Sequence, residues 1–310
     1  MLELHNIADL PADWLDAAVS IGKFDALHLG HQKLLYELVE AAENHSLAAT
    51  VLTFDRHPAQ LLNPESAPIP LIGPDQKKQL IAKTGVDALL TLTFDEKLAS
   101  LTPELFVCEV LLPLKAKLVI VGEDFRFGAH GLGDVSLLRE LGAQHGFTVR
   151  SVGKVTNGGE PISTSRIRDL LDAGDVVAAA RLLGRNHVTT GIIEHGLKIG
   201  RTIGFPTANM SRDAEGYLPL DGVYAGWLYA DGQRYPAAHS VGINETFQAV
   251  PRLVESYVLD RDDLDLYDKE VTIEYVEFIR PTAKFNSKEE LIEEINRDVE
   301  KVRKTLGICW

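Results

Sequence analysis

The stretch Ala17–His31, AAVSIGKFDALHLGH, decides the fold of the first half of the chain. It opens with small and apolar residues typical of a buried strand, turns at Gly22, and enters an amphipathic helix predicted over His31–Asn44. A strand that leads directly into a helix begins a βαβ unit, and such units build parallel sheets with helices on both faces. The stretch therefore predicts an α/β domain whose ligand site lies at the carboxyl ends of the strands.

The same alternation continues to about residue 152. Further strands are predicted over Ala48–Phe54, Ala88–Phe94, Lys117–Val121 and Thr148–Val152. Further helices are predicted over Pro74–Thr84, Pro103–Leu112 and Asp134–His145, followed by a helical pair over Ser163–Ala173 and Asp175–Leu183. Gly174 separates the pair and Gly184 ends it.

After Gly184 the pattern becomes that of an antiparallel β unit. Strand-like runs separated by turn residues are predicted over Val188–Ile193, Gly222–Leu228, Tyr235–Gly242, Leu253–Leu259 and Val271–Phe278. One amphipathic helix, predicted over Ser287–Leu306 with Ser287 and Glu290 as a capping box, closes the unit. We therefore expect two domains, residues 1–185 and 186–310.

Composition narrows the class of protein. The 310 residues are 45% hydrophobic and 25% charged, with a net charge of −14 that is shared evenly between the two halves. An acidic charge spread in this way argues against a protein that binds nucleic acid or an anionic membrane. The two cysteines, Cys108 and Cys309, are too few for a disulfide framework, which favours a reducing, cytoplasmic setting. We expect neither a signal peptide nor a membrane helix.

The segment GKFDALHLGH, residues 22–31, carries the first candidate site. His28 and His31 are three residues apart at the helix entry, beside free N–H groups and the positive end of the helix dipole. Two imidazoles there suit a polyphosphate whose charge grows in a transition state. The alternatives are a metal-binding pair, for which a third ligand is not evident, or two incidental histidines.

Four segments together resemble a known family. They are GKFDALHLGH (22–31), TFDRHP (53–58), GEDFRFG (122–128) and ISTSRIR (162–168). The first resembles the HxGH signature of nucleotidyltransferases, and the set resembles the bacterial bifunctional riboflavin kinase/FAD synthetase family. Ala26 stands where the family usually has Gly, and a methyl group is tolerated there if φ is negative. The hydroxyl residues Thr164 and Ser165 are exchanged relative to the family pattern.

The resemblance implies roles for residues of this first, α/β nucleotidyltransferase-type domain. His28, His31 and Arg168 would be catalytic, through contact with the phosphates of ATP. Substrate-binding roles fall to Gly22, Phe24, Asp25, Asp124, Phe125, Phe127, Ser163 and Thr164. Ordinary packing at a strand end is the alternative for Phe125 and Phe127, and a structural role is the alternative for His57.

The segment GIIEHGLKIGRTIGFPTANM, residues 191–210, carries the second candidate site. It lacks the GxxxxGK[ST] pattern of a P-loop, and its glycines alone could simply serve barrel turns. Thr207 and Asn209 offer hard oxygen ligands suited to Mg²⁺. The run resembles the GRxxGFPTAN signature of riboflavin kinases, which implies that Gly196, Gly200, Arg201, Gly204 and Pro206 bind ATP and that Thr207 and Asn209 hold the metal.

Further segments extend this second resemblance. LDGVYAG (220–226), SVGINETF (240–247) and VESYVLD (254–260) match family segments in order, although Glu245 replaces the usual Pro. In the last of them Glu255 matches the catalytic glutamate, a base for the substrate hydroxyl. An outward-facing residue on an alternating strand is the alternative for Glu255. The resemblance implies a six-stranded antiparallel barrel with a C-terminal helix.

The implied function is flavin cofactor synthesis by a Mg²⁺-dependent, multifunctional transferase. Riboflavin would be phosphorylated by ATP to FMN, and FMN would then be adenylylated by ATP to FAD with release of pyrophosphate. The expected partners are riboflavin, FMN, FAD and ATP, with no nucleic acid and no membrane. Two alternatives stay open: an enzyme with one decayed site, for which Ala26 and Glu245 are the suspects, and a flavin-binding protein without activity. The sequence leaves the oligomeric state open.

Overall fold

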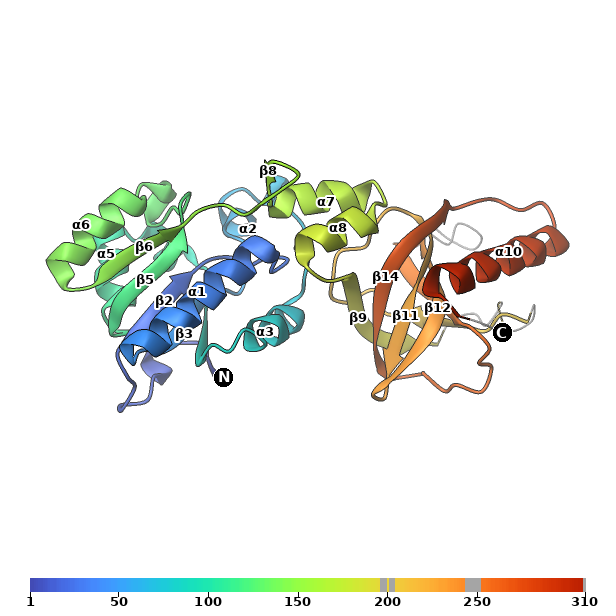
Figure 1. Cartoon of the computed structure of the whole chain (residues 1–310), viewed down its shortest axis with the longest axis horizontal. Coiled ribbons are helices and arrows are strands. Elements are labelled where there is room, and N and C mark those ends of the chain that lie inside the picture. Colours follow the sequence, from blue (N-terminus) through green and yellow to red (C-terminus); the bar gives the residue numbers. More distant parts are fainter. Residues whose placement is uncertain (196–199, 201–203, 243–251, 309–310) are drawn as a thin grey trace. The chain divides into compact units, whose positions relative to one another are not determined.

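The computed structural model describes residues 1–195, 200, 204–242 and 252–308, and the chain divides into two compact units (Figure 1). The first unit contains Met1–Pro70 and Pro74–Ser163. The second contains Thr164–Trp310 together with Leu71–Gly73, a short piece of the first half of the chain. Each unit is described by itself below.

The first unit is built on a six-stranded parallel sheet with the order β1-β4-β3-β2-β5-β6. Its strands are β1 (Leu2–Leu4), β2 (Ala17–Ile21), β3 (Ala48–Phe54), β4 (Ala88–Leu92), β5 (Ala116–Gly122) and β6 (Thr148–Val152). Every residue of β2 is buried, because helices cover both faces of the sheet at its centre. The predicted α/β fold is confirmed.

Helices connect these strands. They are α1 (Leu29–His45), α2 (Pro58–Leu62), α3 (Pro74–Ala82), α4 (Glu96–Ser100), α5 (Pro103–Phe106) and α6 (Val135–His145), with short 3-10 turns at Ile7–Asp9, Pro64–Ser66 and Ala129–Gly131. The helix predicted over Pro103–Leu112 is divided, because its second half, Val107–Leu111, is a π-helical turn that closes with a bond from the Leu112 N–H to the Val107 carbonyl. A small ribbon, β7 (Thr156–Asn157) and β8 (Glu160–Pro161), ends the unit.

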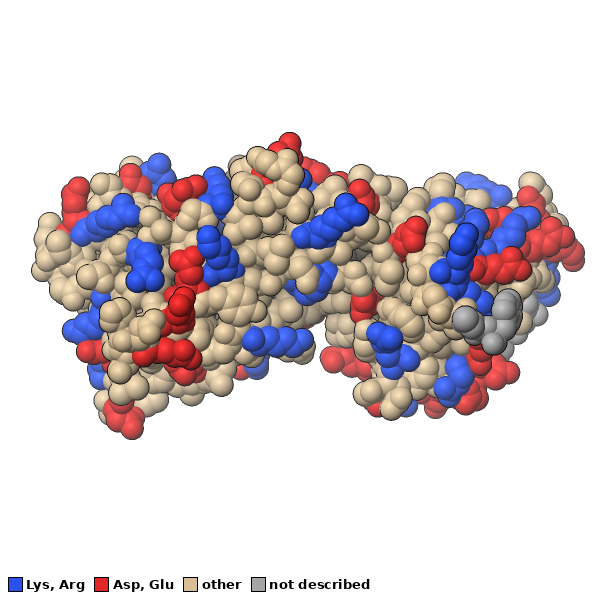
Figure 2. Space-filling model, in the orientation of Figure 1, with Lys and Arg blue, Asp and Glu red and all other residues tan. Residues whose placement is uncertain are grey.

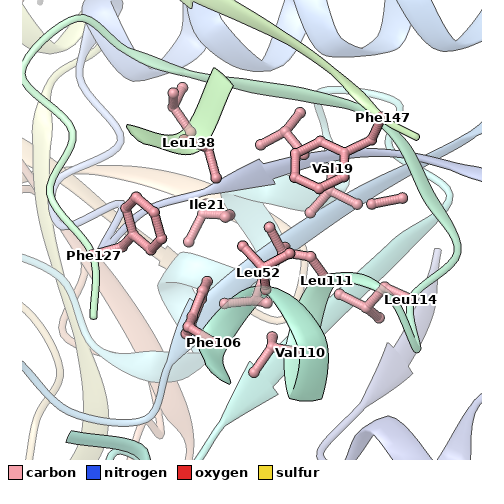
Figure 3. Packing of buried hydrophobic residues seen from close by; sticks show 14 of the residues in the cluster. Val19, Ile21, Leu52, Phe106, Val110, Leu111, Leu114, Phe127, Leu138 and Phe147 are labelled. Carbon is pink, nitrogen blue, oxygen red and sulfur yellow. The ribbon is translucent and has the colours of Figure 1, made fainter. Parts of the chain in front are cut away.

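A hydrophobic core beneath β2 and β3 fixes the part of the sheet that carries the site. Val19, Ile21 and Leu52 point from the strands toward Phe106 and Leu138, which come from α5 and α6 (Figure 3). On the opposite side of the same strands, α1 packs against β2 and β3 (Figure 1). Burial of each such side chain stabilises the fold by about 1.5–3 kcal/mol, so the carboxyl ends of β2 and β3 are held rigidly.

The second unit contains a closed antiparallel barrel of six strands in the order β10-β13-β12-β11-β14-β9. Their bounds are β9 (His187–Glu194), β10 (Thr207–Met210), β11 (Gly222–Ala230), β12 (Gln233–Gly242), β13 (Leu253–Val258) and β14 (Glu270–Pro281). The sequence predicted each of these strands except β10. The predicted barrel is confirmed.

Helix α10 (Lys288–Leu306) closes the barrel unit as predicted. Ser287 caps it by accepting the Glu290 N–H at 3.1 Å, while the Glu290 carboxylate accepts the N–H of Asn286 rather than that of the cap residue. The helix is fixed to β14 by a fork in which the Arg280 guanidinium donates to both oxygens of Asp298 at 2.8–3.0 Å.

Helices α7 (Thr164–Asp172) and α8 (Val176–Leu183) belong to the barrel unit. The Leu220 N–H donates to the Leu171 carbonyl at 2.8 Å, and the Tyr217 hydroxyl donates to Asp172 at 2.7 Å. The compact units therefore divide before α7, whereas the expected domain boundary follows Arg185. Where the two activities divide along the chain stays a prediction.

The described surface is mixed in charge. Lys and Arg side chains are interspersed with Asp and Glu on both units over the face shown in Figure 2. Within the described part of the chain, no helix combines the length and the apolar character needed to cross a membrane.

Candidate functional site

The turn after β2 has a strained backbone. The Gly22 N–H donates to the Leu52 carbonyl at 3.1 Å, and then Phe24, Ala26 and Leu27 adopt φ values of 48°, 66° and 41°. A residue with a β-carbon pays roughly 1–2 kcal/mol in this left-handed region, and only a turn fixed by its surroundings keeps it there. All three side chains are buried, which fixes the turn. The negative φ that would accommodate Ala26 in place of Gly is not found.

His28 and His31 lie together at the start of α1. His28 is the N-cap residue, and its Nδ1 accepts the His31 N–H at 3.3 Å. The two rings stack with centroids 3.8 Å apart and planes within 14°. Gly30 makes room for this arrangement, because a β-carbon there would lie 3.1 Å from the His28 ring. Since Nδ1 of His28 accepts, the proton of the neutral ring is on Nε2.

The His31 ring is enclosed. The rings of Phe24 and His31 meet edge to face with centroids 5.4 Å apart, and Nδ1 of His31 is buried without a hydrogen-bond partner among the described residues. Burial, followed by the charges of His28 and Lys23, holds the pKa of His31 well below its usual value of 6.5. At neutral pH the ring is therefore uncharged, with a polar nitrogen left unsatisfied beside the helix start.

Two further basic side chains, which the sequence did not single out as a pair, meet beside this turn. Nζ of Lys23 lies 3.1 Å from Nε2 of His57, while Nδ1 of His57 accepts the Ala59 N–H at 3.1 Å and caps α2. His57 thus has the structural role that the sequence left open, as the N-cap of α2. The charges of Asp25 and Asp55 act to raise the pKa of Lys77 on α3. Burial has the larger effect, so the pKa of Lys77 lies below its usual value. No local sequence signal marks contacts between residues this far apart in the chain.

The loop after β5 holds the predicted flavin-side residues. The Asp124 carboxylate pairs with Nζ of Lys154 at 3.0 Å. Phe125 and Phe127 are nearly parallel, with centroids 5.7 Å apart, but Phe127 is only 6% exposed and belongs to the core, where it packs against Phe106. Phe127 therefore packs in the core, as the alternative interpretation expects, whereas Phe125 is only partly buried. A role in flavin binding stays a prediction for both.

The segment 162–168 is divided between the two units. Ser163 is the last residue of the first unit, whereas Thr164 and Arg168 belong to α7 in the second. The Arg168 guanidinium lies 5.9 Å from the centroid of the Tyr217 ring. Thr164 and Arg168 therefore belong to a different compact unit from His28 and His31.

The barrel brings Thr207, Asn209 and Glu255 onto one face. Thr207 and Asn209 alternate along β10 with the buried residues Ala208 and Met210, so they share the outer face. Asn209 is directly opposite Glu255 on β13, and such cross-strand partners have β-carbons about 4.5–5.5 Å apart. Residues separated by 46 positions in the sequence thus form one oxygen-rich patch.

A small hollow, partly open to solvent, adjoins Thr207 at the end of this patch. It is lined by residues that include Pro206, Thr207, Ser256, Val258 and Tyr267, polar and apolar alike. Its volume is about 50 Å³, which is room for a few water molecules or a small part of a ligand.

Local geometry favours glycine at positions 200 and 204, before β10. Gly204 has a φ of 89°, and a β-carbon at Gly200 would lie 2.3 Å from the Phe205 carbonyl oxygen and 3.3 Å from Oγ1 of Thr207. Side chains at these two positions are therefore excluded on local grounds. Gly196, Arg201 and Glu245 lie outside the described residues.

The donors of the barrel patch suit the expected metal. A threonine hydroxyl, an amide oxygen and a carboxylate are hard oxygen ligands, and Mg²⁺ prefers a few such ligands together with substrate phosphates. Glu194, opposite Asn209 on β9, adds another carboxylate to the same neighbourhood. The residues present therefore fit Mg²⁺.

Comparison with known proteins matches both halves of the chain. The model of the FAD synthetase family matches residues 10–166, and that of the riboflavin kinase family matches residues 183–306. The chain belongs to the bifunctional riboflavin kinase/FMN adenylyltransferase family. It is accordingly a multifunctional transferase with a FAD synthetase domain and a riboflavin kinase domain, as the sequence predicts. The histidine pair lies in the first matched region and the β10–β13 patch in the second.

Relatives in this family match nearly the whole chain. The bifunctional riboflavin kinase/FMN adenylyltransferase of Escherichia coli K12 is 33% identical, over 98% of this chain and 97% of the relative. Those of Listeria monocytogenes and Bacillus subtilis are 34% and 35% identical, over 94% and 91% of this chain and 93% and 90% of the relatives. A crystal structure from Streptococcus pneumoniae, described as that of a macrolide-efflux protein, has a TM-score of 0.88 at 30% identity and covers 97% of this chain and 98% of its own.

Proposed function

We propose that this chain makes FAD from riboflavin in two ATP-dependent steps, with the histidine pair serving one step and the β10–β13 patch the other. The observation that carries the proposal is the presence of two separate constellations, each suited to a different phosphoryl chemistry. The stacked histidines at the start of α1 suit transfer at an α-phosphate, and the Asn209–Glu255 pair suits transfer to a hydroxyl.

In the kinase step, Glu255 accepts the proton of the terminal ribityl hydroxyl as that oxygen attacks the γ-phosphorus of ATP. The bond between the γ-phosphorus and the bridging oxygen breaks, and the products are FMN and ADP. Thr207 and Asn209 would hold Mg²⁺, which when bound would offset the negative charge of the ATP phosphates. Pro206 lines the small hollow beside β10, and Gly200 lies close to Thr207. We assign Gly200, Gly204 and Pro206 to the binding of ATP.

In the adenylylation step, a phosphate oxygen of FMN attacks the α-phosphorus of ATP, and pyrophosphate leaves. Nε2–H of His28 donates to an oxygen of the α-phosphate, whose negative charge grows in the transition state. The neutral His31 ring and the positive end of the α1 dipole lie beside it, and they stabilise the same charge without adding a proton-transfer step. The family resemblance assigns Arg168, which belongs to α7 of the second unit, to the phosphates of this reaction as well.

We place both reactions in the cytoplasm, on the grounds of cysteine usage, with riboflavin, FMN, FAD and ATP as the partners. The evenly distributed acidic charge supports small-molecule substrates rather than nucleic acid.

The test is incubation of the purified chain with riboflavin, ATP and MgCl₂, with the flavins resolved by chromatography over time. FMN is expected first and FAD later, and EDTA in excess over Mg²⁺ should stop both conversions. Accumulation of FMN without FAD, also when FMN is the added substrate, would show that adenylylation is absent. Flavin binding without turnover would favour a binding protein instead.

A further inference from the structure

Residues 217–221, which lead into β11, form an anchor segment that side chains of the second unit hold in place. Four consecutive carbonyls of this segment accept hydrogen bonds: that of Tyr217 from His187, those of Leu218 and Pro219 from Arg252, and that of Leu220 from the Tyr224 hydroxyl. A segment outside the strands whose carbonyls are all bound has little freedom to move. It therefore offers a rigid support at the rim of the barrel where β11 begins.

Arg252 makes the most contacts with the anchor segment. Its Nε donates to the Asp221 carboxylate at 2.6 Å, its Nη1 donates to the Leu218 carbonyl at 3.5 Å, and its Nη2 donates to the Pro219 carbonyl. Asp221 also lies beside the end of β12, because a β-carbon on Gly242 would be 3.9 Å from its Oδ2. Arg252 directly precedes β13, so its side chain fixes the point at which that strand begins.

The first residues of β13 need such support. In the described ladders Leu253 and Val254 pair with β12, and Glu255 is the first residue of β13 that also pairs with β10, where it is opposite Asn209. The end of a strand that is bonded on one side opens more readily than a part bonded on both sides. Glu255 follows Arg252 by three positions, about 10 Å along an extended strand. Opening from this end therefore reaches Glu255 directly after the singly paired residues.

We infer that Arg252 is a positioning residue for the kinase step, because its contacts with the anchor segment hold the start of β13 and so keep the Glu255 carboxylate opposite Asn209. The inference rests on the proposed kinase function and extends it to a residue that acts through Glu255. Asn209 has separate support, because it also pairs with Glu194 on β9. Loss of the Arg252 contacts should therefore displace the base and leave the metal ligands of β10 in place.

The test compares full-length variants in steady-state kinetics of riboflavin phosphorylation. Arg252→Met removes the contacts, and Arg252→Lys keeps the charge but loses the planar fork that reaches several acceptors. Lys269→Met is the matched control. Lys269 directly precedes β14 and pairs with Asp231 at 2.7 Å, so it forms another ion pair at the start of a strand in the same barrel.

The kcat of Arg252→Met should fall about 10–100-fold, because displacement of a reacting group by about 1 Å has effects of this order. The KM values for riboflavin and ATP should stay within about threefold of the parent, since the ligands on β10 are not displaced. Arg252→Lys should show a smaller fall, and Lys269→Met should match the parent. Parent-like kcat in Arg252→Met would overturn the inference.

A second comparison separates positioning from a general loss of folded protein. If Arg252 acts through Glu255, adding Arg252→Met to Glu255→Gln should lower phosphorylation by less than about threefold further, because the two changes affect one group. A general loss of folded barrel would instead multiply with the effect of Glu255→Gln. A further tenfold fall, on the order of the single variant's own effect, would overturn the inference.

Hydrogen–deuterium exchange, followed by mass spectrometry of the peptide that contains β13, tests the support without turnover. The amides of residues 253–255 should exchange at least about tenfold faster in Arg252→Met and at the parent rate in Lys269→Met. If the parent chain does not phosphorylate riboflavin, the proposed kinase step fails, and unchanged exchange in Arg252→Met would separately overturn the role of Arg252. If tryptophan fluorescence shows that Arg252→Met does not fold, Asp221→Asn, which removes the partner's charge but keeps its shape, replaces it in every comparison.

Discussion

Ala26 carries backbone strain in the turn that leads to the first candidate site. Its φ of 66° is natural for Gly and strained for Ala, yet the side chain is buried in the turn that delivers the stacked histidines to α1. The strain is local, because Gly22 and Gly30 already provide the close approaches that the turn needs. The turn therefore keeps its geometry through packing rather than through backbone preference.

Ala26→Gly should raise the free energy of unfolding of the first unit by about 0.5–1 kcal/mol, the relief of strain less the added freedom of the unfolded chain. Denaturant unfolding followed by circular dichroism measures the change. Ala42→Gly, at a buried position in the last turn of α1, is the control, and it should destabilise the unit by about 1 kcal/mol. A loss of stability in Ala26→Gly would mean that the methyl group contributes packing that outweighs the strain.

His28→Asn should lower the kcat/KM of FAD formation by about 10²–10³-fold, the usual effect of removing one transition-state donor. The Asn side chain can still cap α1, so the melting temperature should stay near that of the parent. Riboflavin phosphorylation is the internal control and should be unchanged. His28→Ala should lose the cap as well, at a further cost of about 1 kcal/mol in stability. Parent-like FAD formation by His28→Asn would contradict the assignment of Nε2–H.

At the scale of elements, the ladder between β10 and β13 brings together the residues of the proposed kinase site. Neither strand carries the site alone, because Thr207 and Asn209 come from one and Glu255 from the other. Their common face follows from the twofold alternation of side chains and from the register that sets Asn209 opposite Glu255. A shift of one residue in this register would turn Glu255 toward the barrel interior.

Glu255→Gln should lower riboflavin phosphorylation by about 10²–10⁴-fold, because the amide keeps the shape of the side chain but cannot accept the proton. Steady-state kinetics of the two half-reactions checks this, and conversion of added FMN to FAD should continue at the parent rate. Glu277→Gln, an exposed change on β14, is the matched control. Normal phosphorylation by Glu255→Gln would move the search for the base to the acidic residues 260–268.

The barrel interior should make the second unit sensitive to acid. Burial lowers the pKa of His187 to about 4 and that of His239 to about 3, from 6.5. Above pH 6.5 both rings are neutral in the folded and unfolded chains, so their contribution to stability is complete. Below pH 6.5 the unfolded chain binds protons first, and each histidine removes about 1.4 kcal/mol of stability per pH unit until the folded pKa is reached.

Unfolding of the barrel, followed by tryptophan fluorescence in urea between pH 7 and pH 5, measures this slope. His239→Gln should make the slope shallower by about one histidine's share, even if its stability at pH 7 is lower than that of the parent. A parent slope near zero over this range would show that burial does not lower the pKa of either ring. Nε2–H of His187 donates to the Tyr217 carbonyl, 2.6 Å away, and His187 is the second position to vary.

The elements show what sequence patterns can predict. Long apolar strands and amphipathic helices were predicted almost to the residue, because burial on a sheet or helix face leaves a clear period. The short strand β1 was missed because Leu2 and Glu3 are exposed, and β10 was missed because its alternation is carried by Ala208 and Met210 rather than by large β-branched residues.

The candidate site was predictable where residues are neighbours in sequence. The placement of His28 and His31 at the helix start follows from their spacing, and the capping bond confirms that placement. The Lys23–His57 contact and the Asn209–Glu255 opposition depend on which strands become neighbours, and no local pattern encodes that. The backbone strain at Ala26 was also beyond the sequence, because φ is set by the packing of the whole turn.

At the scale of the whole molecule, the two candidate constellations lie in different compact units. The histidine pair is in the first unit, and the β10–β13 patch is in the second. The product of one proposed reaction is the substrate of the other, so FMN is the only chemical link that the scheme requires. Variants of the histidine pair should therefore leave riboflavin phosphorylation intact, and variants of the β10–β13 patch should leave adenylylation intact.

A mixture of the His28→Asn and Glu255→Gln proteins should make FAD from riboflavin, although neither protein alone does so efficiently. The first variant still phosphorylates riboflavin, and the second still adenylylates the FMN that is released. Chromatography of the mixture, compared with each variant alone at the same total concentration, checks this. If the mixture makes no FAD while Glu255→Gln converts added FMN, then FMN is not released between the steps.

The segment Leu71–Gly73 has a consequence for how the chain is made. Leu71 and Ile72 are at most 4% exposed, and the Leu71 carbonyl accepts the Tyr217 N–H at 3.1 Å. On the ribosome, these two apolar residues leave the exit tunnel long before Tyr217 is translated. While synthesis continues, the first half of the nascent chain therefore exposes an apolar loop. Chaperones that bind exposed apolar segments are expected to bind it. A gene fragment that stops at residue 163 or 185 would keep that loop uncovered permanently, so an expression experiment on the first half alone should yield a protein prone to aggregation.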